Sequence, residues 1–227
     1  MNIPEGIKEL PSGVWVVEND THYHGWIAKH GLQCDPHLFR WLKPVLERPG
    51  IGVVWDIGAC VGDHTDFYLS LGKTVLAVEP NPIAYRCLEH NCPKAVCVQM
   101  AASDKEGVLR FTVLDNLGAS RITENGEIEV AAEQMDYIGE AVGLGFPHYI
   151  KLDAEGHEPR VIAGMIKTLK SAKPIIYVEI NRGALAGNGF TREDVIGPLR
   201  EIGYGRFTLY PARATWDDEQ FDVLCEV

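Results

Sequence analysis

The chain has 227 residues, 46% of them hydrophobic, with 32 acidic against 21 basic side chains and a net charge of −11. A chain of this length can bury roughly 70% of its unfolded surface in one core, and its negative charge argues against naked nucleic acid as a partner. The opening MNIPEGIKEL lacks the basic and apolar regions of a secretory signal, and no apolar run reaches about 18 residues. We therefore expect a cytoplasmic protein that does not enter a membrane.

The sequence alternates short apolar runs with amphipathic stretches. In chain order it predicts a strand at 14–18, a helix at 36–46, a strand at 51–55, a helix at 64–71, a strand at 74–78, a helix at 82–90, strands at 95–100, 108–113, 127–130 and 148–152, a helix at 158–170, a strand at 174–178, a helix at 192–202 and strands at 206–210 and 221–225. Buried strands between helices indicate a mostly parallel sheet covered on both faces, a doubly wound α/β fold. The last two strands are expected to pair antiparallel. We expect an N-terminal extension with a lid-like segment over 1–50 and the main domain over 51–227.

The cysteines predict neither disulfides nor a metal site. The chain contains no C-x-x-C pair, and the even spacing of three of the cysteines does not match the close ligand pairs of zinc sites. Reduced thiols and no bound metal are therefore expected. The six are Cys34, Cys60, Cys87, Cys92, Cys97 and Cys225.

Acidic residues follow the predicted parallel strands, at the edge where such folds bind ligands. In VVWDIGACVGDH, Asp56 stands where the dinucleotide fingerprint G-x-G-x-x-G has its first glycine, which disfavours a pyrophosphate. S-adenosylmethionine, which is cationic at its sulfonium and ammonium groups and has no phosphate, fits better. Gly58 and Gly62 would admit it closely, and Glu79 would bind its ribose hydroxyls. A plain strand-to-helix turn is the structural alternative.

Four motifs in this order resemble the FkbM family of class I S-adenosylmethionine-dependent methyltransferases: VWDIGACVG, AVEPNP, AASDKEG and KLDAEGHE. The resemblance covers about 35–180 and implies a Rossmann-like seven-stranded sheet and methylation of hydroxyls on small molecules such as sugars or polyketides. It also implies that Asp56, Gly58 and Gly62 hold the methionine end, that Glu79 holds the ribose, that Ala102, Ser103 and Asp104 hold the adenine, and that Asp35 closes over the cofactor. The expected cofactor site also includes Ala59, Pro80, Asn81 and Asp153.

The chain departs from the family pattern next to this turn. The family usually has Asn at the position of Cys60 and aromatic residues at those of Asp63 and His64. The hydrogen bond to the cofactor that the family's Asn would make is therefore in question. The floor of the pocket is expected to differ from that of other family members.

Transfer of a methyl group to a hydroxyl requires a base that removes the hydroxyl proton. His157 in DAEGHE is the candidate base, because its ordinary pKa of about 6.5 lies near working pH and neighbouring carboxylates would raise it. Asp153 and Glu155 would position the substrate and the sulfonium, and Glu179 would orient His157 or bind the acceptor. Alternatively, the acids only favour the start of the following helix and His157 has no role.

The acceptor is expected to be a small hydroxylated molecule, contacted by residues outside the core motifs. Asn116, Ser120 and Arg121 in the strand-rich insert are candidates, and Tyr23, His24 and Trp26 are lid candidates. Two other classes of protein stay open: a nicotinamide-dependent oxidoreductase, and a domain that binds S-adenosylmethionine without catalysis. A homodimer is possible.

Overall fold

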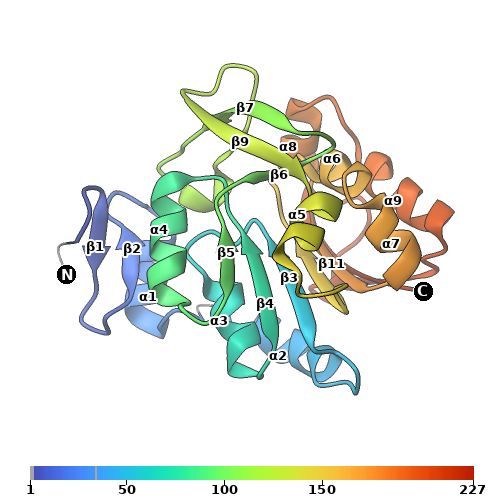
Figure 1. The fold of residues 1–227 in the computed structure, drawn as a ribbon, viewed down its shortest axis with the longest axis horizontal. Coiled ribbons are helices and arrows are strands. Elements are labelled where there is room, and N and C mark those ends of the chain that lie inside the picture. Colours follow the sequence, from blue (N-terminus) through green and yellow to red (C-terminus); the bar gives the residue numbers. More distant parts are fainter. Residues whose placement is uncertain (1–2, 34) are drawn as a thin grey trace.

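The structure is a computed structural model that describes residues 3–33 and 35–227 (Figure 1). A seven-stranded sheet in the order β12-β13-β11-β10-β3-β4-β5 forms its centre. The strands from β11 to β5 run parallel, and β13 pairs antiparallel with both β11 and β12. The predicted Rossmann-like sheet is thereby confirmed. Its strands are β3 (Val53–Ile57), β4 (Thr74–Val78), β5 (Val96–Val98), β10 (Tyr149–Leu152), β11 (Ile175–Asn181), β12 (Arg206–Tyr210) and β13 (Gln220–Glu226).

Helices cover both faces of the sheet because its strands are apolar on both sides. Neighbouring residues such as Val54 and Trp55 belong to different core clusters, as the alternation of strand side chains requires. The first cluster contains residues of α2 (Pro36–Leu46), α3 (Asp63–Ser70) and α4 (Pro82–Asn91). The second contains residues of α5 (Met135–Val142), α6 (Glu158–Ala163), α7 (Ile166–Ala172), α8 (Arg182–Gly187) and α9 (Arg192–Ile202).

The strand-rich insert forms a second sheet with its own small core. Its order is β6-β9-β7-β8, and it stands at the top of the view in Figure 1. Phe111 and Val130 are among the side chains of this core. A short 3-10 helix, η1, lies in the connection between β7 and β8, and residues 114–120 of this connection are called the tip of the insert. The elements are β6 (Ala101–Ser103), β7 (Gly107–Thr112), η1 (Leu117–Ala119), β8 (Arg121–Ile122) and β9 (Ile128–Gln134).

The N-terminal segment packs against α4 and contributes to the first core cluster. It consists of β1 (Ile7–Glu9), β2 (Trp15–Val17) and α1 (Tyr23–His30). The side chain of Asn91 in α4 bonds both the backbone N–H and the carbonyl of Trp15, and the ring of His90 stacks on the Trp15 indole at 3.9 Å. These contacts fix β2 to α4. The division of the chain at residue 50 stays a prediction.

Three differences from the predicted elements affect the site. Strands β3 and β11 run further than expected, so Asp56 and Glu179 lie inside strands and not after them. The helix expected over 158–170 is broken between α6 and α7, at Gly164. A Cβ on this glycine would lie 1.8 Å from the carbonyl oxygen of Ser103, so the break lets β6 pack closely against the helix end.

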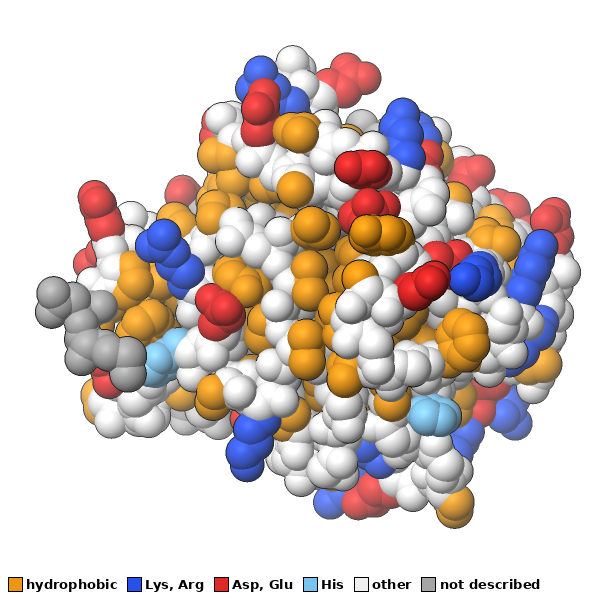
Figure 2. Space-filling view, viewed as in Figure 1, with side chains coloured by type: hydrophobic (Ala, Val, Ile, Leu, Met, Phe, Trp, Pro, Cys, Tyr) orange, Lys and Arg blue, Asp and Glu red, His pale blue; other side chains and the backbone are white. Residues whose placement is uncertain are grey.

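The remaining general expectations concern cysteines and surfaces. The five described cysteines are free thiols, as predicted, while Cys34 lies outside the described residues. Within 3–33 and 35–227, no helix combines the length and apolar character that crossing a bilayer requires. Figure 2 shows hydrophobic side chains over the middle of one face, and Tyr137 of α5 and Val108 of β7 are among the exposed large ones. The possible homodimer stays a prediction.

Candidate active site

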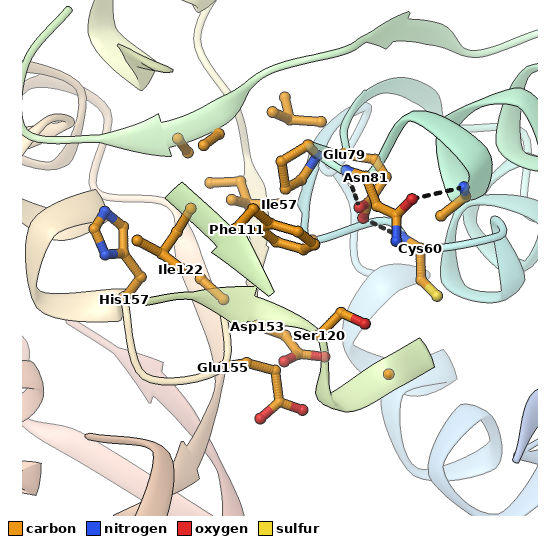
Figure 3. A pocket seen from close by; sticks show the side chains of 18 of the residues that line it. Ile57, Cys60, Glu79, Asn81, Phe111, Ser120, Ile122, Asp153, Glu155 and His157 are labelled. Atoms are coloured by element: carbon orange, nitrogen blue, oxygen red, sulfur yellow. Dashed lines mark hydrogen bonds between the residues drawn. The ribbon is translucent and has the colours of Figure 1, made fainter. Parts of the chain in front are cut away.

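A cavity opens at the carboxyl ends of β3, β4 and β10, beneath the insert (Figure 3). The sheet side contributes polar residues that immediately follow these strands, including Gly58, Glu79 and Asp153. Apolar and aromatic side chains, among them Tyr23 and Phe111, line the cavity from the N-terminal segment and the insert. The cavity therefore has a polar floor and a largely apolar cover, as expected for a small-molecule site.

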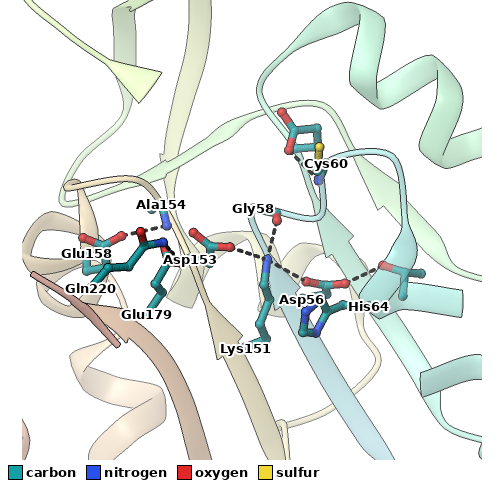
Figure 4. A network of polar contacts seen from close by, with 12 residues as sticks. Asp56, Gly58, Cys60, His64, Lys151, Asp153, Ala154, Glu158, Glu179 and Gln220 are labelled. Carbon is teal, nitrogen blue, oxygen red and sulfur yellow. Dashed lines mark hydrogen bonds and ion pairs between the residues drawn. The ribbon is translucent and has the colours of Figure 1, made fainter. Parts of the chain in front are cut away.

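A buried lysine connects the two main loops of the floor (Figure 4). The Nζ atom of Lys151 in β10 donates to the carbonyl of Gly58 at 2.5 Å and lies 3.2 Å from a carboxylate oxygen of Asp153 and 3.6 Å from one of Asp56. Burial alone would lower the pKa of Lys151, but Asp153 and Asp56 raise it well above its ordinary value. Lys151 is therefore a retained ammonium group.

Asp56 does not reach the cavity. It is fully buried, its second oxygen accepts from the Thr65 hydroxyl at 2.6 Å, and it is absent from the cavity lining. Burial raises its pKa and Lys151 opposes that shift. The expectation that Asp56 faces a cationic ligand is therefore not supported, because the cation beside it is the chain's own lysine.

The turn after β3 is shaped by close backbone contacts. Gly58 has φ +79°, and a Cβ there would lie 1.8 Å from the carbonyl oxygen of Asp153. Gly62 has φ +100°, and a Cβ there would meet the Cys92 sulfur at 2.7 Å. Gly58 lines the cavity, whereas Gly62 and the buried Ala59 lie behind it. These glycines therefore admit neighbouring parts of the chain, and only Gly58 is placed to approach a ligand.

Cys60 and Glu155 are non-glycine residues in left-handed backbone conformations, with φ of +49° and +47°. Both line the cavity. Asn tolerates this conformation better than most residues, so the Asn that the family usually has at the position of Cys60 suits the backbone found here. Strained residues of this kind gather at functional sites.

Glu79 occupies the position expected for a ribose partner. Its two oxygens accept from the backbone N–H groups of Cys60 and Asn81, each at 2.8 Å, and burial raises its pKa to about 7. Pro80 and Asn81 also line the cavity. The Nδ2 atom of Asn81 is buried without a hydrogen-bond partner among the described residues. An unpaired donor beside Glu79 fits a bound molecule rich in hydroxyl or ring-nitrogen acceptors, as S-adenosylmethionine is.

His157 belongs to the side of the cavity where the adenine was expected. Its Nε2 atom lies 3.0 Å from the hydroxyl of Ser103, and Ala102 lines the cavity nearby. The predicted rise of its pKa is wrong: burial, followed by the charge of Arg160, lowers the pKa of His157 to about 4. Arg160 also bonds the Asp104 carboxylate at 2.6 Å. His157 is therefore neutral and turned toward Ser103.

Three carboxylates gather where a methyl acceptor was expected; Asp153 and Glu155 line the cavity, whereas Glu179 does not. One oxygen from each of Asp153, Glu155 and Glu179 lies within 4.8 Å of the others. Burial, followed by Asp153 and Glu158, raises the pKa of Glu155 to about 8. Burial and Asp153 raise that of Glu179 well above its ordinary range. Such a set is also compatible with a cation, so the expected absence of a metal stays a prediction.

Polar residues that sequence reasoning missed support this cluster. Asn181 donates to Glu155 at 3.3 Å, and Gln220 of β13 donates to Glu179 at 2.8 Å. Glu158 is buried and accepts from the backbone N–H groups of Ala154 and Gly156, so it holds its own loop. Lys151 was missed too, although a lysine inside the apolar run HYIKL was a usable signal.

Several predicted residues lie away from the cavity. Asp35 is exposed and caps α2 through the backbone N–H groups of His37 and Leu38. Asp63 and His64 are buried at the start of α3, and His64 bonds the Tyr68 hydroxyl at 3.0 Å. The expectations that Asp35 closes over the cofactor and that the Asp63–His64 pair forms the pocket floor are therefore not supported.

Of the residues proposed to contact the acceptor, Ser120 and Tyr23 line the cavity. The others, Asn116, Arg121, His24 and Trp26, do not line it. Arg121 donates to the carbonyl of Ala119, and Trp26 is about half exposed. Contact with the acceptor therefore stays a prediction for Ser120 and Tyr23 alone.

Comparison with known proteins identifies the family. The model of the methyltransferase FkbM domain matches residues 56–204, which include the floor of the cavity. The chain belongs to the FkbM methyltransferase family. Its cofactor is S-adenosylmethionine, as the sequence predicted, and the nicotinamide-dependent alternative is not supported.

A curated relative and solved structures agree with this assignment. The hexuronic acid methyltransferase AglP of Haloferax volcanii is 29% identical in an alignment of 137 residues that covers 58% of this chain and 56% of AglP. The fold is similar to that of methyltransferase FkbM from Methylobacillus flagellatus KT, with a TM-score of 0.54 and 16% identity over 77% of this chain and 43% of that one. It is also similar to the magnesium protoporphyrin IX methyltransferase of Synechocystis PCC 6803 with bound SAM, with a TM-score of 0.50 and 13% identity over 91% and 84% of the two chains.

The role of Lys151 can be tested by removing its charge. We expect Lys151→Met to lower the free energy of unfolding by about 3–5 kcal/mol, because it leaves the buried Asp56 carboxylate without a counter-charge. Adding Asp56→Asn should restore part of this loss, since Asn can still accept from Thr65. Urea unfolding of both variants is the measurement, and a single variant within about 1 kcal/mol of the wild type would contradict the assignment.

Proposed function

We propose that the chain transfers a methyl group from S-adenosylmethionine to a hydroxyl group of a sugar-like small molecule. The observation that carries this proposal is the carboxyl group of Glu155, which lines the cavity beside Asp153 and has its pKa raised toward working pH. The relative AglP, named for hexuronic acid, supports a sugar acceptor. The aromatic ring of Tyr23, which also lines the cavity, suits a polyhydroxylated ring, which has an apolar face and hydrogen-bonding edges.

The floor of the cavity would hold the cofactor. Glu79 is proposed to accept from the ribose hydroxyls and Asn81 to donate to a neighbouring acceptor atom. Ala102, with His157 and Ser103 behind it, would form the adenine wall, and Asp153 would face the cationic end. When bound, S-adenosylmethionine supplies an activated methyl group on a good leaving group, so the residues of the chain contribute chiefly by positioning.

Glu155 replaces His157 as the proposed base. A base with a pKa of about 4 has little tendency to take a hydroxyl proton, whereas a carboxylate with a pKa of about 8 is well matched to the task. Asn181 holds one Glu155 oxygen at 3.3 Å, which leaves the other free to accept from a substrate hydroxyl. The charges of Asp153 and Glu158 would sustain the raised pKa of Glu155.

The proposed activity predicts a methylated sugar. Incubation of the protein with S-adenosylmethionine and a panel of hexuronic acids, neutral hexoses and non-sugar alcohols should give a mass increase of one methyl group in a sugar. Mass spectrometry and formation of S-adenosylhomocysteine provide two independent readouts. Methylation of the non-sugar alcohols alone would contradict a sugar acceptor, and transfer only to amines or carbon atoms would contradict O-methylation.

The base assignment predicts a pH dependence. Because Glu155 must be ionised to accept a proton, kcat/KM should rise with pH and level off above about 8, the pKa of Glu155 in the free protein. Glu155→Gln should lower turnover about 100-fold or more and remove this rise. Glu201→Gln, at an exposed position on α9, is the matched control. Retention of the wild-type profile by Glu155→Gln would exclude Glu155 as the base.

A variant of His157 is expected to behave differently from Glu155→Gln, because the two residues have different proposed roles. His157→Gln should weaken binding of S-adenosylhomocysteine about 10-fold by loss of the Ser103 contact, while turnover at saturating cofactor falls far less than in Glu155→Gln. Calorimetry gives the first quantity and steady-state kinetics the second. Unchanged affinity combined with a 100-fold loss of turnover, a scale typical of a lost general base, would return the base role to His157.

A further inference from the structure

Two segments far apart in the sequence meet over the cofactor cavity. Tyr23, at the start of α1, and Leu117 and Gly118, in η1, all line the cavity. The Tyr23 ring packs on Gly118 so closely that a Cβ there would lie 2.9 Å from it. The cover of the cavity is therefore built jointly by the N-terminal segment and the tip of the insert.

Asp20 joins these two segments. It is 7% exposed, and its Oδ1 atom accepts from the backbone N–H of Leu117 at 3.0 Å. The same carboxylate accepts from the N–H groups of His22 at 3.3 Å and His24 at 2.8 Å, at the start of α1. A single side chain thus satisfies donors on both segments, 97 residues apart in the first case.

A second contact runs alongside the first. The backbone N–H and the hydroxyl of Thr21 both donate to the carbonyl of Asp115, at 2.8 and 3.0 Å. Leu117 is buried in the first core cluster, which the N-terminal segment shares with α2, α3 and α4, although the insert has a core of its own. The tip of the insert is therefore fastened to the N-terminal segment as well as to β8 of its own sheet.

The N-terminal segment can act as a fixed support for this fastening. Asn91 and His90 hold Trp15 of β2 on α4, and α4 begins directly after Glu79 and Asn81 on the cavity floor. The tip is therefore connected, through Asp20, β2 and α4, to the residues of the cavity floor that are proposed to hold the cofactor.

We propose that Asp20 is a positioning residue that holds the tip of the insert over the cofactor cavity. A preorganised cover lowers the ordering cost of binding, so Asp20 favours binding of the cofactor and of any acceptor without touching either. The inference concerns the cover alone and does not depend on the identity of the acceptor.

Asp20→Asn tests this role. The amide replaces one acceptor oxygen by a donor that faces backbone N–H groups, so the bridge to Leu117 or the one to α1 is lost. We expect the Kd of S-adenosylhomocysteine to rise about 10-fold, as for loss of a charged hydrogen bond, with kcat at saturation changed much less. Hydrogen exchange at the amides of 114–120 should accelerate. Asp115→Asn is the matched control, because its side chain is exposed and its backbone makes the contact.

A wild-type Kd and wild-type exchange in folded Asp20→Asn would overturn the proposal. If that variant does not fold, Thr21→Val provides the second test, since it removes only the exposed hydroxyl contact to Asp115. It should accelerate exchange in 114–120 and raise the Kd about 2- to 3-fold, the scale of one neutral hydrogen bond. No change in either quantity would also overturn the proposal. Because cofactor binding is the readout, a failure here is distinct from a failure to methylate sugars.

Discussion

The buried ammonium group of Lys151 is the interaction on which the cavity floor depends. It brings the loop after β3 and the loop after β10 together by binding Gly58, Asp56 and Asp153 at once. Two carboxylates this close to each other would repel without it, and burial would then favour their protonation. With the lysine in place, Asp153 keeps an orientation toward the cavity while Asp56 anchors the other end. The charge arrangement is internal to the chain and exists before any ligand arrives.

This arrangement separates the cavity into two chemically different halves. Toward Glu79 and Ser103, carboxylate and hydroxyl groups are already engaged by the backbone or by His157, which makes that half a rigid binding surface. Toward Glu155 and Glu179, carboxyl groups crowd together and hold protons more tightly than usual. The proposed binding and proton-transfer roles thus fall on different groups of residues in one pocket. A cationic group placed between the halves would lie nearest Asp153.

The sequence predicted the sheet, most of the helices that flank it and the position of Glu79, because these follow from local apolar patterns and from the residues just past strands. It missed α5 and α8. It could not predict the environment of Asp56 or His157. The role of Asp56 depends on a lysine 95 positions later in the chain, and the pKa of His157 depends on burial and on Arg160, not on the acids beside it in sequence. Sequence adjacency suggested a charged neighbourhood for His157, but the backbone turn at Glu155 and Gly156 sends these side chains apart. The contact of Asp20 with the insert was beyond reach for the same reason.

The position of β13 in the sheet has a consequence for the nascent chain. This strand is inserted between β11 and β12, and its first residue, Gln220, is the donor that satisfies Glu179. During synthesis the sheet from β5 to β11 can assemble first, with the acidic rim already present but its partner from β13 still to come. The edge of β11 stays open for pairing over that interval, and an open strand edge invites association with other chains. Pairing of β13 with β11 therefore protects this sheet edge and brings Gln220 to Glu179 in one step.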